Sequence, residues 1–216
     1  MKLSENTLTV LKNFSTINDG LVLRKGNVQR SMATDKSVLV EAEFTEAIPQ
    51  DFGIYDLSQF LGNITTLSEP ELEFRGNDVI LNDEVITLTY RSCSPTLVVS
   101  PPDKKLELKT VDVEFDLSAA SLQKIIKIAA MNSFPVLAVE GKNGKISLLA
   151  SDDSDTSNTA EMHLTDYAGE NVKFKFKTEH FNMIPGDYKV KIQKDAFAVF
   201  ENKNMPIKYF IAIQSK

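Results

Sequence analysis

Cysteine, histidine and tryptophan are scarce in this chain, and long apolar runs are missing. Its 216 residues include one cysteine, two histidines and no tryptophan. The single Cys93 cannot form a disulfide within the chain, which fits a reducing compartment. Few zinc ligands are available, no apolar run is long enough to span a bilayer, and polar residues follow Met1 at once. We therefore expect no disulfide scaffold, metal site, membrane segment or signal peptide.

The sequence also lacks the common motifs of catalysis and cofactor binding. It has no phosphate-binding loop, dinucleotide fingerprint, nucleophile elbow or paired-cysteine zinc site. Two carboxylate pairs could still serve a small hydrolase if a pocket brought them together, namely Asp51 with Asp56 and Asp152 with Asp153. These absences favour a binding or assembly protein without enzymatic activity or a cofactor. A small hydrolase stays open as an alternative.

What is present is ordinary for a globular chain. Hydrophobic residues make up 42% and charged residues 25%, as in typical domains. The formal net charge is −6, which argues against a surface covered with phosphate contacts. A basic stripe on one face remains compatible with this charge, because binding depends on the local potential and not on the sum.

A proline-rich stretch divides the chain. Residues 93–105 contain three prolines, and because proline fixes φ and removes a backbone donor, we expect an extended connector. The sequence on each side predicts the same plan, a helix followed by strands, then a second helix and more strands. We predict an α+β protein of two similar domains, residues 1–92 and 106–216, with helices packed on one side of antiparallel sheets.

The predicted helices follow capping residues and repeat apolar side chains at spacings of three and four. They cover residues 4–15, 56–67 and 118–131, with a short helical turn at 179–184. The predicted strands alternate polar and apolar residues between turn signals. In the first half they cover residues 20–25, 28–34, 37–45, 51–55, 71–74, 79–81 and 85–91. In the second half they cover residues 106–115, 135–140, 145–150, 160–165, 172–177, 187–193, 196–201 and 207–214, with a polar loop over 151–159.

Five stretches, in order along nearly the whole chain, carry a family resemblance. They are residues 1–18, 54–62, 94–101, 122–126 and 183–189, and they resemble the DNA polymerase sliding clamp of T-even-type tailed bacteriophages. The resemblance implies a homotrimeric ring with helices lining the hole and sheets outside. It implies duplex DNA, a DNA polymerase and an ATP-dependent clamp loader as partners, in the cytoplasm of the infected bacterial host. It also implies a coactivator role in late transcription.

A ring that slides must attract phosphates without reading bases. Lysines on the first predicted helix of each domain meet this need, and Lys124 and Lys127 are surface neighbours because they lie three residues apart. The candidate DNA-facing residues are Lys2, Lys12, Lys124, Lys127 and Lys177. An ordinary solvated helix face is the alternative reading of such lysines.

Ring closure and partner binding require further surfaces. Pairing of edge strands satisfies exposed backbone groups, and by analogy with the family we expect edges at 85–91 and 160–165. The interface candidates are Val85, Thr87, Thr89, Met162 and Leu164. Partners in this family dock through short apolar peptides, for which we expect a pocket formed by Leu97, Val98, Val99, Ile207, Tyr209 and Ile211. Internal strands and core packing are the alternative readings of these residues.

A second alternative to the clamp is an unrelated structural or virion assembly protein of the same α+β class. Such a protein would form no ring and would not stimulate a polymerase. The mass of the assembled protein separates the two possibilities, because a trimer of 24.1 kDa subunits favours the clamp.

Overall fold

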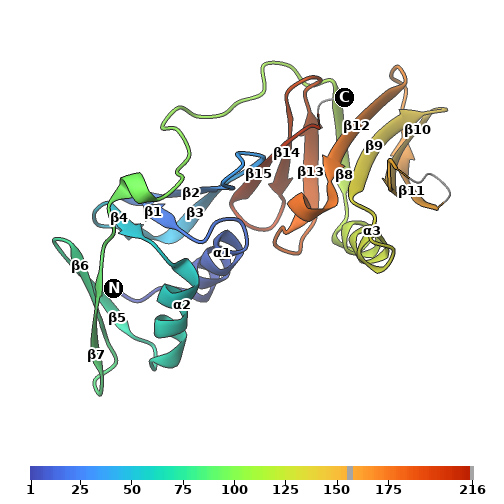
Figure 1. The fold of residues 1–216 in the computed structure, drawn as a ribbon. Helices are drawn as coiled ribbons and strands as arrows, with labels where there is room; N and C mark the ends of the chain where they lie inside the picture. The colour runs from blue at the N-terminus through green and yellow to red at the C-terminus, as the bar shows by residue number, and fades with distance from the viewer. Residues whose placement is uncertain (155–157, 215–216) are drawn as a thin grey trace. The chain divides into compact units, whose positions relative to one another are not determined.

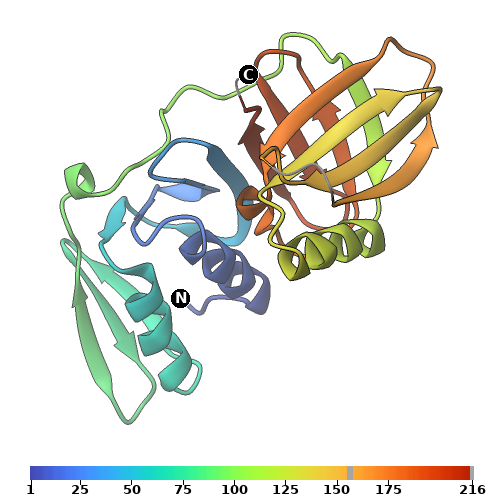
Figure 2. The same cartoon turned by 45° about the vertical axis from the view of Figure 1, so that its right-hand side comes forward.

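The computed structural model describes residues 1–154 and 158–214. The chain forms two compact units, residues 1–105 and residues 106–216. Each unit combines antiparallel sheets with helices (Figure 1; Figure 2), and the α+β class predicted from the sequence is confirmed. The proline-rich stretch 93–105 belongs to the first unit. No helix in the described part of the chain is long and apolar enough to cross a membrane.

The helices of the first unit are α1 (Glu5–Ser15) and α2 (Leu57–Thr66), which contact one another. The Ser4 hydroxyl and the Asp56 carboxylate cap them by accepting hydrogen bonds from backbone N–H groups three residues on, as N-cap residues do. The strands are β1 (Leu21–Leu23), β2 (Gly26–Met32), β3 (Val38–Ile48), β4 (Phe52–Ile54), β5 (Glu71–Arg75), β6 (Asp78–Asn82) and β7 (Thr87–Arg91).

Three sets of antiparallel pairs organise these strands. Strand β1 pairs with β4, β2 pairs with β3, and β5, β6 and β7 form a sheet in that order. Strand β7 therefore lies at one edge of its sheet. It begins at Thr87, two residues later than predicted, because the Asp83 carboxylate accepts hydrogen bonds from the backbone N–H groups of Val85 and Ile86 and holds both in the preceding turn.

The second unit contains one long helix and two sets of strands. Helix α3 (Ala119–Met131), capped by Ser118, packs against β10 and β11. The first sheet has the order β11–β10–β9–β12, and in the second set β15, β14, β13 and β8 are consecutive neighbours. The bounds are β8 (Val113–Leu117), β9 (Val136–Lys142), β10 (Lys145–Ser151), β11 (Thr159–Asp166), β12 (Val172–Lys177), β13 (Tyr188–Ile192), β14 (Phe197–Asn202) and β15 (Ile207–Ala212).

One secondary-structure prediction for this unit was wrong, and another has shifted bounds. The strand predicted over 106–115 begins only at Val113, because the preceding alternation does not reflect burial: Leu106 is 41% exposed and Val111 is 48% exposed. The short helical turn predicted at 179–184 is present as a 3-10 helix, η2 (Thr178–Phe181), which ends three residues earlier than predicted. Part of the loop predicted over 151–159, residues 155–157, lies outside the described residues.

Candidate nucleic-acid and partner interfaces

The exposed faces of α1 and α3 carry lysines without acidic partners. Lys12 is exposed on α1, opposite the buried Leu11 and Phe14. Lys124 and Lys127 are exposed on α3, away from its buried residues. Across residues 1–154 and 158–214, none of the three lysines lies within ion-pair distance of a carboxylate. Their charges are therefore fully available to an external anion.

The other two lysines predicted to face DNA are partly neutralised. The Lys2 ammonium lies 3.3 Å from the Glu69 carboxylate, and the Lys177 ammonium lies 3.2 Å from the Glu179 carboxylate. Both pairs are largely exposed, so each contributes little to stability. The neighbouring carboxylates still reduce the positive potential around these lysines.

Charge is distributed unevenly between the helices and the rest of the chain. Helices α1, α2 and α3 together contain three lysines and one glutamate, a net charge of +2 in a chain of net charge −6. Helix α2 carries no charged residue, and its exposed side presents serine, threonine and glutamine. The helices are therefore the positive part of an acidic protein, and a local potential of this kind attracts polyanions.

Both strand regions predicted as subunit edges include edge strands. Strand β7 ends the order β5–β6–β7, and β11 ends the order β11–β10–β9–β12. On β7, Thr87 and Thr89 are exposed, whereas on β11, Met162 and Leu164 are half-buried. Val85 lies outside the strand, in the turn before β7, and is 89% exposed. The structure thus offers two edges with unpaired backbone groups, and their use between subunits stays a prediction.

The predicted partner pocket is only partly accessible. Ile207, Tyr209 and Ile211 are at most 1% exposed and belong to the core of the second unit, so the expectation that they line a pocket was wrong. The Tyr209 hydroxyl accepts a hydrogen bond from the backbone N–H of Ile184 at 3.0 Å. The error arose because adjacent residues of β15 are buried as well as alternate ones, and a sequence pattern does not reveal what covers each face.

In the connector, the three predicted pocket residues differ in exposure. Leu97, in the 3-10 turn η1 (Pro95–Leu97), is 65% exposed, and Val99 is 37% exposed. Val98 is buried and packs against Gly20, where an added Cβ would lie 3.0 Å from its side chain. Val98 therefore anchors the connector to the first unit, while Leu97 and Val99 remain accessible to a partner.

A groove that the sequence did not reveal lies in the second unit beside the end of β15. It has a volume of about 1080 Å³. Its apolar lining comes from Val172 and Phe174 on β12, Ala196 in the turn before β14, and Ile213 after β15. Sequence reasoning missed the groove because these segments are far apart in the chain. The polar residues of the groove are Asp153, Asn171, Lys173, Lys175, Lys194, Asp195 and Gln214.

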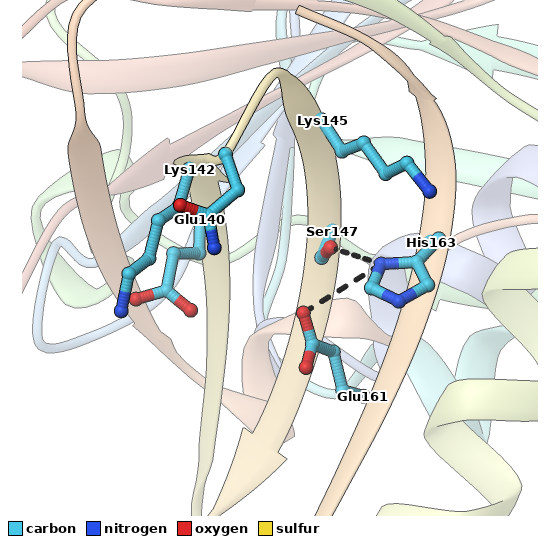
Figure 3. A pocket seen from close by; sticks show the side chains of 7 residues that line it. Glu140, Lys142, Lys145, Ser147, Glu161 and His163 are labelled. Carbon is cyan, nitrogen blue, oxygen red and sulfur yellow. Dashed lines mark hydrogen bonds and ion pairs between the residues drawn. The ribbon is translucent and has the colours of Figure 1, made fainter.

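A smaller hollow of about 360 Å³ lies on one face of β9, β10 and β11 (Figure 3). The Ser147 hydroxyl lies 2.8 Å from Nδ1 of His163, and the Glu161 carboxylate lies 3.6 Å from the same nitrogen. A serine–histidine–carboxylate catalytic relay needs the serine and the carboxylate on opposite ring nitrogens. The arrangement is therefore a polar cluster and not a catalytic triad.

The carboxylates considered for a hydrolase each have a structural role. Hydrogen bonds from the Lys25 backbone and the Arg24 guanidinium hold the pKa of Asp51 below its usual value of 3.8. The single cysteine is not an activated nucleophile either: burial raises the pKa of the Cys93 thiol and disfavours the thiolate. The described residues include no cluster of three metal-ligating side chains. The partners are Lys25 and Arg24 for Asp51, Gln59 for Asp56, Ser154 for Asp152 and Lys175 for Asp153.

Comparison with known proteins covers the whole chain. Residues 2–74 match the family model described as DNA polymerase processivity factor, and residues 114–215 match that of the gp45 sliding clamp C-terminal region. The chain is 31% identical to the sliding clamp of Vibrio phage KVP40 over 222 residues, spanning 100% of both proteins. It is 28% identical to the sliding clamp of Enterobacteria phage T4 over 225 residues, spanning 100% of this chain and 97% of that one.

The fold is also that of a solved structure of low sequence identity. The structure of the C-terminal region of FEN-1 bound to A. fulgidus PCNA matches with a TM-score of 0.70 and 15% identity, over 97% of this chain and 95% of that one. With its two units of antiparallel sheets and helices, the chain therefore has a DNA-clamp fold. The chain belongs to the sliding clamp family of DNA polymerase processivity factors. The family resemblance is confirmed, and the virion assembly alternative is set aside.

Proposed function

We propose that three copies of this chain form a ring that encircles duplex DNA and tethers a DNA polymerase during synthesis. The observation that carries this proposal is the placement of Lys12, Lys124 and Lys127 on exposed helix faces without acidic partners. Membership of the sliding clamp family supports it. The chain has no catalytic role in this proposal and acts by holding two macromolecules together.

The helix faces suit sliding rather than sequence recognition. Lysine is a flexible point charge that attracts phosphates without fixed geometry, and α1, α2 and α3 contain no arginine, the residue that most often reads guanine. The uncharged polar face of α2 would add weak contacts that do not fix the position of the protein along the DNA. Enclosure of the DNA supplies retention, so a few lysines per subunit suffice. The acidic remainder of the chain would limit nonspecific binding outside the ring.

Edge strands supply the ring contacts in this proposal. Pairing β7 of one subunit with β11 of the next would extend a sheet across the boundary and satisfy backbone groups that are otherwise unpaired. Because the two surfaces differ, the contact is head-to-tail, and a head-to-tail contact closes into a ring when its rotation allows. Thr87, Thr89, Met162 and Leu164 would lie at this boundary, with Val85 in the adjacent turn.

Apolar surfaces away from the helices would receive partner proteins. Leu97 and Val99 are exposed in the connector, and the groove beside β15 has an apolar lining with three lysines among its polar residues. A short peptide with an apolar anchor and acidic neighbours fits that composition. We infer that the polymerase and an ATP-dependent clamp loader use these surfaces in the cytoplasm of the infected bacterium. A role in late transcription stays a prediction.

Mass and activity test the proposal together. The mass is measured over a range of protein concentrations, because a weak trimer dissociates on dilution, and negative-stain images of the protein alone reveal whether a ring forms. Product length is then measured with a phage polymerase and loader on primed circular DNA. The proposal expects three 24.1 kDa subunits in a ring, and longer products when the chain is added. A protein that remains monomeric at every concentration and leaves product length unchanged contradicts it.

A further inference from the structure

Strand β11 presents an incomplete polar cluster at the edge of its sheet. Glu161 and His163 lie on the exposed side of β11, beside Ser147 of β10 (Figure 3). The Glu161 side chain is 47% exposed, and its carboxylate lies 3.6 Å from Nδ1 of His163. Among the described residues, no lysine or arginine pairs with this carboxylate. Because β11 is an edge strand, a further chain that pairs with it could supply a cation to this carboxylate.

Strand β7 offers a matching cation at its end. The Arg91 side chain is 79% exposed. Its Nε and Nη2 donate to the Asp78 carboxylate at 3.0 and 3.4 Å, which orients the guanidinium and leaves Nη1 for a second carboxylate. Arginine is suited to such shared pairing because its donors form a planar fork.

Strand lengths and exposure restrict how the two edges can pair. We require that all five residues of β7 pair antiparallel with residues of β11. The half-buried Leu88 and Tyr90 of β7 must also lie beside half-buried residues of β11, because a shift by one residue would exchange the two faces of the strand. Two alignments meet both conditions, and the second extends past Leu164, where the pairing of β11 with β10 shifts by one residue. In one, Arg91 faces Thr159 and Thr89 faces Glu161. In the other, Arg91 faces Glu161 and Thr89 faces His163.

We propose that subunits of the ring join through β7 and β11 in the alignment that places Arg91 of one copy opposite Glu161 of the next. This alignment pairs opposite charges directly across the strands, which favours it over the other. The partner copy thereby completes the cluster around His163. This inference rests on the ring proposed above and adds the register and the charge pair that specify it.

Cysteine cross-linking tests the register. Residues directly opposite in a ladder have Cα atoms close enough for a disulfide, whereas diagonal neighbours are about 7–8 Å apart. In a Cys93→Ser background, the proposed alignment predicts an intersubunit disulfide between Thr89→Cys and His163→Cys. The matched control combines Thr89→Cys with Glu161→Cys, which would cross-link only in the other alignment. Both Thr89 and His163 are exposed, so the substitutions should be tolerated.

The charge pair is tested by substituting each side. Arg91→Gln and Glu161→Gln should each raise the apparent dissociation constant of the trimer by about threefold per interface at low salt, and less at high salt. The double variant should be no weaker than either single one, because both substitutions remove the same interaction. The control is Glu73→Gln, which removes an ion pair with Arg75 on β5 and should leave assembly unchanged.

The outcomes separate the register from the ring. Cross-linking of the Thr89–His163 pair with non-additive charge effects supports the proposal. Cross-linking of the Thr89–Glu161 pair, or a trimer in which neither pair cross-links, overturns the register while the proposed ring stands. A parent protein that does not assemble at any concentration removes both the register and the ring.

Discussion

The Glu46 carboxylate on β3 accepts a hydrogen bond from the Thr7 hydroxyl on α1 at 2.6 Å. The same carboxylate accepts a second hydrogen bond from the backbone N–H of Ser4 at 2.8 Å. A negative charge at the start of a helix also interacts favourably with its dipole. Glu46 therefore fixes the first turn of α1, the helix that presents Lys12.

Loss of this carboxylate should make the first unit less stable and less sensitive to acid. Burial alone would raise the pKa of Glu46, but the hydrogen bonds from Thr7 and Ser4 outweigh it and lower the pKa below the usual 4.5. A lowered pKa stabilises the fold at higher pH, and this stabilisation is lost as the pH falls through the folded-state pKa. Glu46→Gln should therefore lower the unfolding free energy by about 1 kcal/mol at pH 7 and by less in acid.

Urea unfolding at neutral and acid pH measures this effect. Glu43→Gln is the matched control, since Glu43 is exposed on the same strand and accepts a solvent-exposed hydrogen bond from the half-buried Asn27. Equal losses for the two variants, or the same loss for Glu46→Gln at both pH values, would show that the contact with α1 has no special role.

Adding one methyl group at Gly53 should disturb the docking of the connector. A Cβ there would lie 2.4 Å from the carbonyl oxygen of Cys93, a backbone atom that cannot move aside easily. The backbone N–H of Cys93 also donates to the Gly53 carbonyl at 2.9 Å. Gly53→Ala should cost about 1–3 kcal/mol of stability, as overpacking does.

The same glycine-to-alanine substitution at Gly62 in α2 should not lower stability. Apart from the adjacent residues and the backbone of α2 itself, no atom lies within 4 Å of a Cβ added there, and alanine is a better helix former than glycine by up to about 1 kcal/mol. Gly62→Ala should therefore leave stability unchanged or raise it. Thermal unfolding measures the stability of both variants. A Gly53→Ala protein as stable as the parent would show that the connector is not held at this point.

The helices could be predicted from the sequence because their signals are local. Ser4, Asp56 and Ser118 each stand immediately before the helix that they cap, and apolar spacing marks the buried stripe of each helix. The strand predicted over 106–115 failed because alternation shows amphipathic character and not the presence of a pairing strand. Residues 106–112 alternate in sequence, yet most of them are exposed and none belongs to a strand.

The candidate surfaces were less predictable because they depend on packing between distant segments. Lys124 and Lys127 could be assigned to one exposed helix face from their spacing alone. By contrast, the burial of Tyr209 depends on residues such as Tyr188, whose ring centroid lies 6.1 Å away. The groove beside β15 requires three segments to meet, and nothing in any one of them indicates the other two.

Alkaline pH should unfold the second unit through its buried tyrosines. Burial raises the pKa of both Tyr188 and Tyr209 above the usual 10.0. The hydroxyl of Tyr188 donates to the carbonyl of Ile184, and that of Tyr209 accepts from the N–H of the same residue. Because the unfolded chain loses these protons at lower pH than the folded chain, the unfolding free energy should be constant below about pH 10 and fall above it.

A tyrosine-to-phenylalanine comparison tests this expectation. Tyr209→Phe leaves the N–H of Ile184 without its acceptor and should cost about 1–3 kcal/mol at pH 7, while the decline of stability above pH 10 becomes shallower. Tyr55, which is 66% exposed, serves as the control and should show neither effect. Ultraviolet absorbance of tyrosinate, followed together with circular dichroism, shows whether the buried tyrosines ionise only on unfolding. Ionisation of all tyrosines in the folded protein near pH 10 contradicts the expectation.

Charge reversal on α3 should shorten the residence of the loaded ring on DNA. Lys124→Glu with Lys127→Glu removes two exposed cations from a helix that carries no carboxylate, so fewer counterions are released when the helix approaches phosphates. The slope of log affinity against log salt should become shallower by at least about two, since each phosphate contact contributes about 0.9. On linear DNA with free ends the ring should escape faster, while trimer formation is unchanged.

The matched control is Lys104→Glu with Lys105→Glu in the connector, two exposed lysines outside the helices. If the α3 variant keeps the parental salt dependence and residence time, α3 does not face the DNA.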